Sequence, residues 1–172
     1  MTDVDSIRTH LQRCRAELLA AADAVPASQW QHSPAPGRWS AAEILAHVTM
    51  VEHAITEGAR KVLAAEPRRY SLWRRLHPPL AIVLWRGIRR ETPIPLDCSL
   101  VAEKAAMQQR LSDARSRTLA LLQENAGRNL RRWCWPHPFL GPLNYYEWFR
   151  LLGYHDLRHA KQMREVTRTL RP

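Results

Sequence analysis

Two histidines near the end of this 172-residue chain have the spacing of a metal-binding pair. His155 and His159 stand in the run His-Asp-Leu-Arg-His. Residues four apart lie one above the other on a helix, so both imidazoles can reach a single divalent ion. They share an expected buried stripe with Trp148, Leu152, Gln162 and Val166. Such a pair is either a metal site or two core histidines satisfied by hydrogen bonds, because a buried imidazole needs a partner for its lone pair.

A third histidine falls on the expected inner face of an earlier helix. Ser40 and Glu43 have the pattern of a capping box, in which the serine hydroxyl accepts from a backbone amide and the glutamate reaches back to the cap residue. The helix that starts there carries His47 on a stripe that also contains Ile44, Val51, Ala54 and Gly58. His53 lies off this stripe and is expected at the surface.

If these two helices are antiparallel neighbours, His47, His155 and His159 can meet around one ion. Three neutral nitrogen ligands leave the remaining coordination positions to water or substrate, which is the arrangement of a catalytic site rather than a closed structural one. Imidazole suits several divalent transition metals, and we expect zinc or nickel ahead of iron or copper.

Four helices must position these histidines. Amphipathic stretches predict helices over residues 3–24, from residue 40 onward, over 99–125 and over 145–170. No stretch shows the period-two alternation of a strand, and no internal repeat is evident. The prediction is an all-α protein, a four-helix bundle that forms a single domain over residues 1–172, with a long crossover between the second and third helices.

The crossover, residues 67–95, is irregular because prolines interrupt it repeatedly and arginine pairs separate its large apolar residues. A short amphipathic helix is expected within residues 79–90. The segment either forms a basic surface for a membrane or a partner, or packs on the bundle with its arginines in water, and we favour the second interpretation.

The net charge of +10 could indicate a nucleic-acid-binding protein, because phosphate binding uses clustered Lys and Arg. The arginines are instead spread over the first helix, the crossover and the last helix without a nucleic-acid-binding motif, so we expect no specific nucleic-acid partner.

The longest apolar stretch, residues 78–85, is too short to span a membrane. Three scattered cysteines and an N-terminus without a signal-peptide pattern predict a cytoplasmic protein.

Three runs of the sequence together resemble the signatures of the DinB-like superfamily, which includes the YfiT-type proteins. They are residues 39–47 (WSAAEILAH), 137–141 (HPFLG) and 155–162 (HDLRHAKQ), and they occur in that family's order. The resemblance spans most of the chain. It implies an up-down-down-up bundle, a divalent metal held by His47, His155 and His159, and a homodimer.

The resemblance also implies a range of activities. Characterised relatives include S-transferases that use bacillithiol or mycothiol, a mycothiol-dependent maleylpyruvate isomerase and proteins regarded as metal-dependent hydrolases. For this chain it implies a metal-dependent enzyme acting on a small-molecule substrate, with water or a low-molecular-weight thiol as the nucleophile. Despite the family's name, it implies no DNA binding.

Two other chemical interpretations are weaker. The run from His155 to His159 is similar to the zinc-protease pattern His-Glu-x-x-His, but the shorter Asp156 replaces the glutamate that acts as the base. Cys134 and His137 have a Cys-x-x-His spacing that could serve a nucleophile or a second metal, although packing and backbone capping are commoner roles in a tryptophan-rich loop. His137 matches the family's His-Pro-x-x-Gly and is expected to shape that loop.

Two functions from different classes stay open. In the first, the protein is an enzyme, thiol S-transferase-like or hydrolase-like, in which the metal acts as a Lewis acid. In the second, it is a non-catalytic metal-binding module. A cleft open to solvent at the metal, with spare polar groups such as Tyr145, Tyr154 or Gln162 nearby, would favour the enzyme. A metal sealed by side chains would favour the module.

Overall fold

The computed structural model describes residues 3–68, 70–71, 73, 76–85 and 96–170. Most of these residues lie in four long helices: α1 Asp3–Asp23, α2 Ala41–Leu63, α3 Lys104–Glu124 and α4 Tyr145–Leu170. Short 3-10 helices occupy parts of the connections: η1 Ala27–Gln29, η3 Leu80–Leu84 and η4 Cys98–Leu100. A hairpin of two short strands, β1 Cys134–His137 and β2 Gly141–Asn144, precedes α4.

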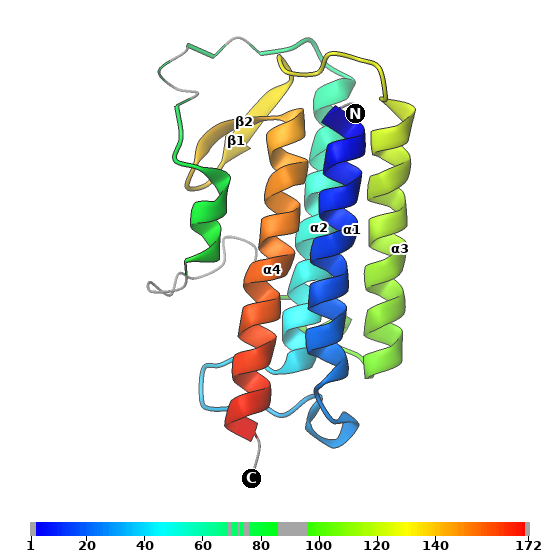
Figure 1. The fold of residues 1–172 in the computed structure, drawn as a ribbon, viewed down its shortest axis with the longest axis vertical. Coiled ribbons are helices and arrows are strands. Elements are labelled where there is room, and N and C mark those ends of the chain that lie inside the picture. The colour runs from blue at the N-terminus through cyan, green and yellow to red at the C-terminus, as the bar shows by residue number, and fades with distance from the viewer. Residues whose placement is uncertain (1–2, 69, 72, 74–75, 86–95, 171–172) are drawn as a thin grey trace.

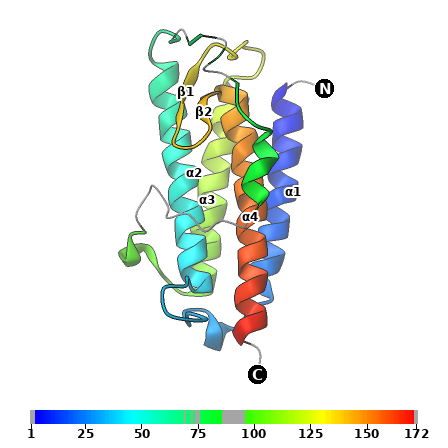
Figure 2. The ribbon, with the colours of Figure 1, turned by 90° about the vertical axis from the view of Figure 1, so that its left-hand side faces the viewer.

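The long helices form a bundle with up-down-down-up topology (Figures 1 and 2). In the view of Figure 1, α1 runs downward, α2 and α3 both run upward, and α4 returns downward beside α1. Because α2 and α3 are parallel, the chain between them must travel back along the bundle, and η3 lies on this path against α4. The predicted all-α four-helix bundle with a long crossover is confirmed.

Local sequence signals decide where α2 and α4 begin. Ser40 Oγ accepts from the backbone N–H of Glu43 at 3.2 Å, and Glu43 Oε2 accepts from the N–H of Ser40 at 2.7 Å, which is the predicted capping box. At α4, Asn144 Oδ1 accepts from the backbone N–H groups of Tyr146 and Glu147. The Glu147 carboxylate accepts in turn from the N–H of Asn144. Both predicted helix starts are confirmed.

The start predicted for α3 is wrong, because the helix begins at Lys104 rather than at Ser99. Asp97 Oδ1 accepts from the N–H of Ser99 at 2.9 Å and from its hydroxyl at 2.6 Å, which stabilises the separate turn η4. A short acidic side chain that bonds to nearby backbone in this way competes with a regular helix. η4 therefore contacts α2 as a turn of its own instead of extending α3.

The hairpin before α4 contradicts the prediction that no strand is present. β1 and β2 pair antiparallel, with Pro136 opposite Pro142. Strands of four residues are too short to show alternation, and a facing pair of prolines removes two backbone donors, so the sequence pattern did not reveal them. Packing holds the hairpin on α4: the ring of Trp135 stacks on that of Trp148 with centroids 5.1 Å apart, and Trp148 Nε1 donates to the Trp135 carbonyl.

The middle of the crossover packs on the bundle, as the favoured interpretation predicts. Arg158 Nη1 of α4 donates to the carbonyls of Val83 at 2.7 Å and of Trp85 at 2.6 Å. Leu80 and Val83 contact the core, whereas Ile82 and Trp85 are exposed. The crossover is therefore anchored by two apolar side chains and by one arginine that caps its backbone.

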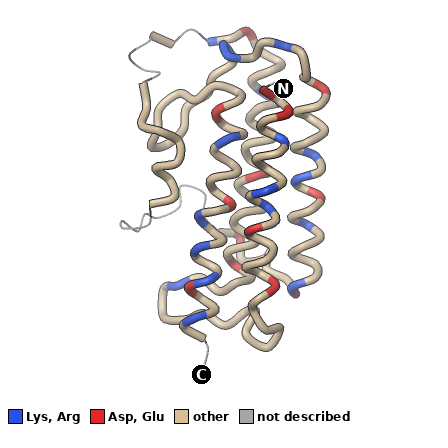
Figure 3. The backbone as a smooth tube through the Cα atoms, viewed as in Figure 1, with Lys and Arg blue, Asp and Glu red and all other residues tan. Residues whose placement is uncertain are grey.

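The amphipathic helix predicted within residues 79–90 is a five-residue 3-10 helix, η3, in the structure. The remaining part of that prediction, residues 86–90, lies outside the described part of the chain. Figure 3 shows Lys and Arg on each long helix, mixed with Asp and Glu rather than gathered in one part of the bundle. No helix of the described ranges is long and apolar enough to cross a membrane.

The buried face of α2 departs from the predicted stripe after its first turns. Ile44 and His47 are buried as predicted, but Ala54 is exposed. Glu52 and Thr56, which a hydrophobic pattern does not select, are buried in its place. The reason is that α2 packs against both α3 and α4, so it buries a wider arc than one stripe and part of that arc is polar.

One charged side chain from each long helix enters a buried ion cluster, which we call the ion quartet: Arg15 of α1, Glu52 of α2, Arg115 of α3 and Asp156 of α4. Arg15 Nε donates to Asp156 Oδ2 at 3.0 Å, and Arg15 Nη2 donates to Glu52 Oε2. Arg115 Nη2 donates to Asp156 Oδ2 at 2.9 Å, and Arg115 Nε lies 2.8 Å from Glu52 Oε1. The two positive and two negative charges compensate each other away from water.

Replacing Glu52 by alanine should lower the free energy of unfolding by about 3–5 kcal/mol, because it leaves two buried guanidinium groups without one of their carboxylates. Glu57→Ala is the matched control. Glu57 lies on the same helix in an exposed ion pair with Arg60, 3.6 Å apart, and its loss should cost less than about 0.5 kcal/mol. Chemical denaturation measures both changes. Equal losses in the two variants would show that the ion quartet does not stabilise the bundle.

Candidate metal centre

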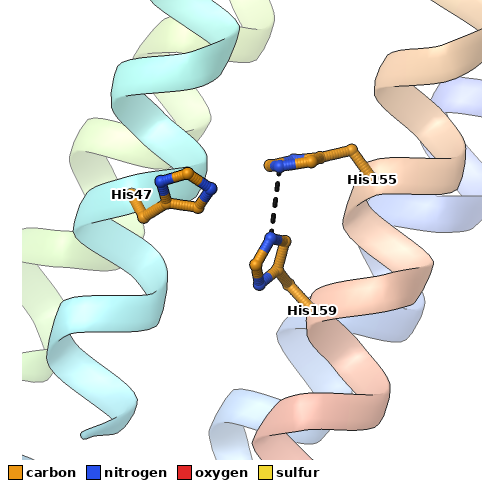
Figure 4. A group of neighbouring side chains, drawn as sticks. All are labelled: His47, His155 and His159. Carbon is orange, nitrogen blue, oxygen red and sulfur yellow. Dashed lines mark hydrogen bonds between the residues drawn. The ribbon is translucent and has the colours of Figure 1, made fainter. Parts of the chain in front are cut away.

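Three histidines meet between α2 and α4 (Figure 4). His47 lies near the start of α2, and His155 and His159 lie midway along α4. One ring nitrogen of each residue lies within 4.8 Å of the others, and the Nε2 atoms of His155 and His159 are 3.1 Å apart. The centroid of the His47 ring is 5.3 Å from that of His155 and 5.0 Å from that of His159. The structure thus brings the three predicted residues together, and we call them the histidine group.

Burial keeps the imidazoles of the histidine group neutral. His47 and His159 are each 5% exposed, and His155 is half-buried. Burial lowers the pKa of His47 to about 4. Burial also lowers the pKa values of His155 and His159 well below the ordinary value, and the neighbouring histidines add to both shifts. A neutral imidazole has a free lone pair, which a metal ligand requires.

The spacing of the histidine group suits a small divalent ion. Two nitrogen ligands about 2.1 Å from one ion lie roughly 3.0–3.4 Å apart, and the His155–His159 pair already has such a separation. His47 belongs to the other helix and stands farther off, so its ring must approach the pair for one ion to touch all three. No other His, Cys, Asp or Glu of the described ranges belongs to the group.

Hydrogen bonding argues against two ordinary core histidines. The Nδ1 atoms of His47 and His155 are buried and have no hydrogen-bond partner among the residues that the structure describes. Buried polar atoms are nearly always bonded, and a core histidine with a purely structural role is expected to satisfy both of its ring nitrogens. The donor set and the spacing fit a divalent metal, and the two incompletely bonded rings are unlike those of a hydrogen-bonded core pair.

Trp39 covers one side of the histidine group. The centroid of its ring lies 4.8 Å from that of His47 and 6.5 Å from that of His159, in the second case with the two rings nearly parallel. Trp39 also lines a surface pocket of about 550 Å³, together with Gln31, Ser33, Gly37, Arg38, Ser40, Glu43, Cys98 and Val101. The indole therefore borders both the histidine group and a pocket large enough for a small molecule.

The remaining histidine and cysteine candidates lie outside the group. His53 is exposed, as predicted. His137 shapes the hairpin turn, because its Nδ1 accepts from the backbone N–H groups of Phe139 and Leu140, each at 3.1 Å, and this prediction is confirmed. Cys134 is buried, and residues three apart in a strand point to opposite faces, so the structure gives no support to a nucleophile pair of Cys134 and His137.

Of the polar residues considered as neighbours of the metal, only Gln162 is at the site. Its Oε1 lies 2.9 Å from His159 Nδ1. Tyr145 is buried with its hydroxyl donating to a backbone carbonyl of α3, and burial raises its pKa. Tyr154 packs edge-on against His10 of α1, with ring centroids 4.9 Å apart. Gln162 is therefore the polar side chain that can influence the histidine group directly.

Asp156 cannot be the base of a zinc protease. Its side chain is fully buried, and both carboxylate oxygens accept from Arg15, while Oδ2 also accepts from Arg115. The sequence pattern did not predict this role of Asp156, because the run His-Asp-Leu-Arg-His is typical of a pair of metal-ligating histidines. The available signal was the presence of charged residues, Arg15 and Glu52 among them, beside apolar core positions of otherwise amphipathic helices.

Fold and site together define a class of protein: an up-down-down-up four-helix bundle with three histidines gathered between its second and fourth helices. Comparison with known families agrees with this description. The sequence model of the DinB superfamily matches residues 10–163, and the chain belongs to this superfamily.

Solved structures share the fold at low sequence identity. The chain is similar to YfiT from Bacillus subtilis, which is described as a probable metal-dependent hydrolase with an unusual four-helix bundle topology. The TM-score is 0.66 at 18% sequence identity, and the match covers 96% of this chain and 86% of YfiT. It is also similar to TT2238, a four-helix bundle protein, with a TM-score of 0.59, 19% identity, and coverage of 92% and 95%. The uncharacterised protein YuaE of Bacillus subtilis strain 168 is 24% identical over 134 residues, 77% of this chain and 80% of that protein.

Alanine at His47, His155 or His159 should each weaken zinc binding by at least about 100-fold. Each change removes one of three ligands, whereas losing only a supporting hydrogen bond typically costs about 10–100-fold. His53→Ala is the matched control, because His53 is exposed on the same helix as His47. Competition with a chromophoric chelator, on protein without a histidine tag, measures the affinities. Equal affinity in the wild type and all three variants would refute the metal site.

The metal-free protein should lose stability in mild acid. Unfolding returns each histidine to a pKa of about 6.5, whereas the folded protein holds that of His47 at about 4. Below about pH 6.5 the unfolded state therefore binds more protons, and the free energy of unfolding falls as the pH falls, by up to about 1.4 kcal/mol per pH unit for each buried histidine. Denaturation at several pH values tests this. His47→Leu should flatten the slope and His53→Leu should not, and unchanged slopes in both would contradict the assignment.

Proposed function

We propose that this protein is a metal-dependent enzyme that holds a divalent transition metal, zinc or nickel, through His47, His155 and His159 and acts on a small-molecule substrate. The observation that carries the proposal is the gathering of three neutral imidazoles without a fourth His, Cys, Asp or Glu among the described residues. Catalytic zinc sites have three protein ligands and an open position, whereas structural sites are closed by four.

A divalent ion in this position supplies Lewis-acid chemistry, since it lowers the pKa of a water or thiol so that the anion can attack an electrophile. The chain supplies orientation and an environment with little water. His47 and His159 hold their lone pairs in a nearly buried space, where electrostatic interactions are stronger than in solvent. Trp39 packs against His47 and also lines the pocket, so a substrate in that pocket would contact the indole.

The reaction that we propose is the attack of a nucleophile on an electrophilic small molecule. The nucleophile is water in a hydrolase-like reaction or a low-molecular-weight thiol in an S-transferase-like reaction. Membership of the DinB superfamily supports this range, and YfiT, which shares the fold, is described as a probable metal-dependent hydrolase.

A non-catalytic metal-binding module is the second candidate, and burial is the observation that favours it. His47 and His159 are each only 5% exposed, and the Trp39 ring lies against both. An ion held under such a cover would stabilise the contact between α2 and α4 without meeting a substrate. The two candidates differ in one measurable property, which is the access of small solutes to the ion.

Cobalt substitution separates the candidates. In an enzyme, a small thiol such as 2-mercaptoethanol should reach the ion and produce a sulfur-to-cobalt charge-transfer band in the near ultraviolet, because the thiolate is a good metal ligand. His155→Ala should abolish the band, and His53→Ala should retain it. If cobalt binds but neither thiols nor small anions change its spectrum, the site is closed and the module becomes the better account.

A further inference from the structure

Gln162 makes His159 different from the other two histidines. Its Oε1 lies 2.9 Å from His159 Nδ1, from a position one helical turn further along α4. The Nδ1 atoms of His47 and His155 have no comparable contact among the described residues, although both are buried. His159 is therefore the ring of the group whose Nδ1 is held by a neighbour, which lies on its own helix.

The contact assigns a proton. An amide oxygen accepts hydrogen bonds and cannot donate them, so the His159 Nδ1 that faces it must carry the hydrogen. A neutral imidazole has only one N–H, and the Nε2 atom of His159 is then left with its lone pair. Figure 4 shows this side of the His159 ring turned toward His155, and the two Nε2 atoms are 3.1 Å apart.

The same logic assigns the proton between the two rings of α4. Because His159 Nε2 can only accept, the hydrogen bond to it must come from His155 Nε2–H in the metal-free protein. The buried Nδ1 of His155 is then an acceptor without a partner among the described residues. Gln162 thus determines the tautomer of His159 directly and that of His155 through it in the metal-free protein. An ion bound through His155 Nε2 would require the His155 proton to move to Nδ1.

We propose that Gln162 is a positioning residue, which fixes the tautomer of His159 and keeps its Nε2 lone pair directed into the space shared by the histidine group. The relevance for metal binding rests on the proposed function, but the tautomer is a property of the metal-free chain. Without an acceptor at Nδ1, His159 can place its proton on Nε2, and that form cannot bind a metal through the same atom. Supporting hydrogen bonds of this kind contribute about 10–100-fold to metal affinity.

Nitrogen-15 NMR of the ring nitrogens tests the tautomer without any metal. At about pH 8 the imidazoles are neutral, and His159 should show a protonated Nδ1 and an unprotonated Nε2, with the opposite pattern for His155. Gln162→Leu should let His159 populate the Nε2–H form, whereas Gln162→Glu should preserve the wild-type pattern because a carboxylate only accepts. A wild-type His159 that carries its proton on Nε2 would overturn the proposal.

Zinc affinity, measured by competition with a chelator, tests the consequence. Gln162→Leu should bind zinc about 10–100-fold more weakly, and Gln162→Glu should restore the wild-type affinity or exceed it. Gln109→Leu is the matched control, because Gln109 is an exposed glutamine of α3 whose amide donates to Asp113, and it should bind as the wild type does.

The outcomes separate the positioning role from the proposed function. Wild-type zinc affinity in Gln162→Leu would overturn the positioning role and leave the metal site intact. Failure of the wild type to bind any divalent metal would refute the proposed function, and the NMR measurement would then decide the tautomer assignment by itself.

Discussion

The arrangement of the bundle depends on four buried charges that must stay together. Each long helix contributes one member of the ion quartet, with the side chains of Arg15 and Arg115 each 7% exposed and those of Glu52 and Asp156 fully buried. Taking such groups out of water costs several kcal/mol per ion, and the cost is offset only when all partners are in place. A helix that slid or rotated by one residue would leave a charge unpaired, so the quartet favours one register among the ways in which apolar faces could pack.

This register also sets the histidine group. Asp156 follows His155 directly, so the rotation of α4 that points Asp156 at the arginines turns the His155 and His159 side of the helix toward α2. On α2, Glu52 belongs to the quartet, and His47, which is also buried, lies nearer the start of the helix. A structural cluster and a candidate metal centre thus share two helices. The ion quartet constrains the position of the histidine group.

The surroundings of the site show two kinds of constraint. Packing places the rings: Trp39 lies against His47 and His159, and the stacked pair of Trp135 and Trp148 fixes the hairpin on the first part of α4. Hydrogen bonding is sparse by comparison, since only one ring of the group has a partner at Nδ1 among the described residues. Burial lowers the imidazole pKa values and leaves lone pairs available, which is favourable for a metal ligand and costly for a core that holds no ion.

The sequence by itself determined the features that depend on neighbours along the chain. The caps at Ser40 and Asn144 could be predicted because a cap is made within three residues, and the His155–His159 pair could be predicted because one turn of helix brings its members together. The caps and the pair are local features, so the spacing of residue types was sufficient to find them. Helical periodicity also placed His47 on an inner face, and the family signatures implied that it joins the pair.

Only the tertiary structure decided which distant side chains meet. Arg15 and Asp156 are 141 positions apart, and no periodicity indicates that two charged residues beside core positions will pair with each other. The hairpin of β1 and β2 exists because Trp148 offers a surface for Trp135, not because its own four-residue strands have a strand pattern. Residue spacing describes one helix at a time. The relative rotation of the helices is set by the simultaneous burial of side chains from all four helices. These combined contacts exist only in the folded bundle.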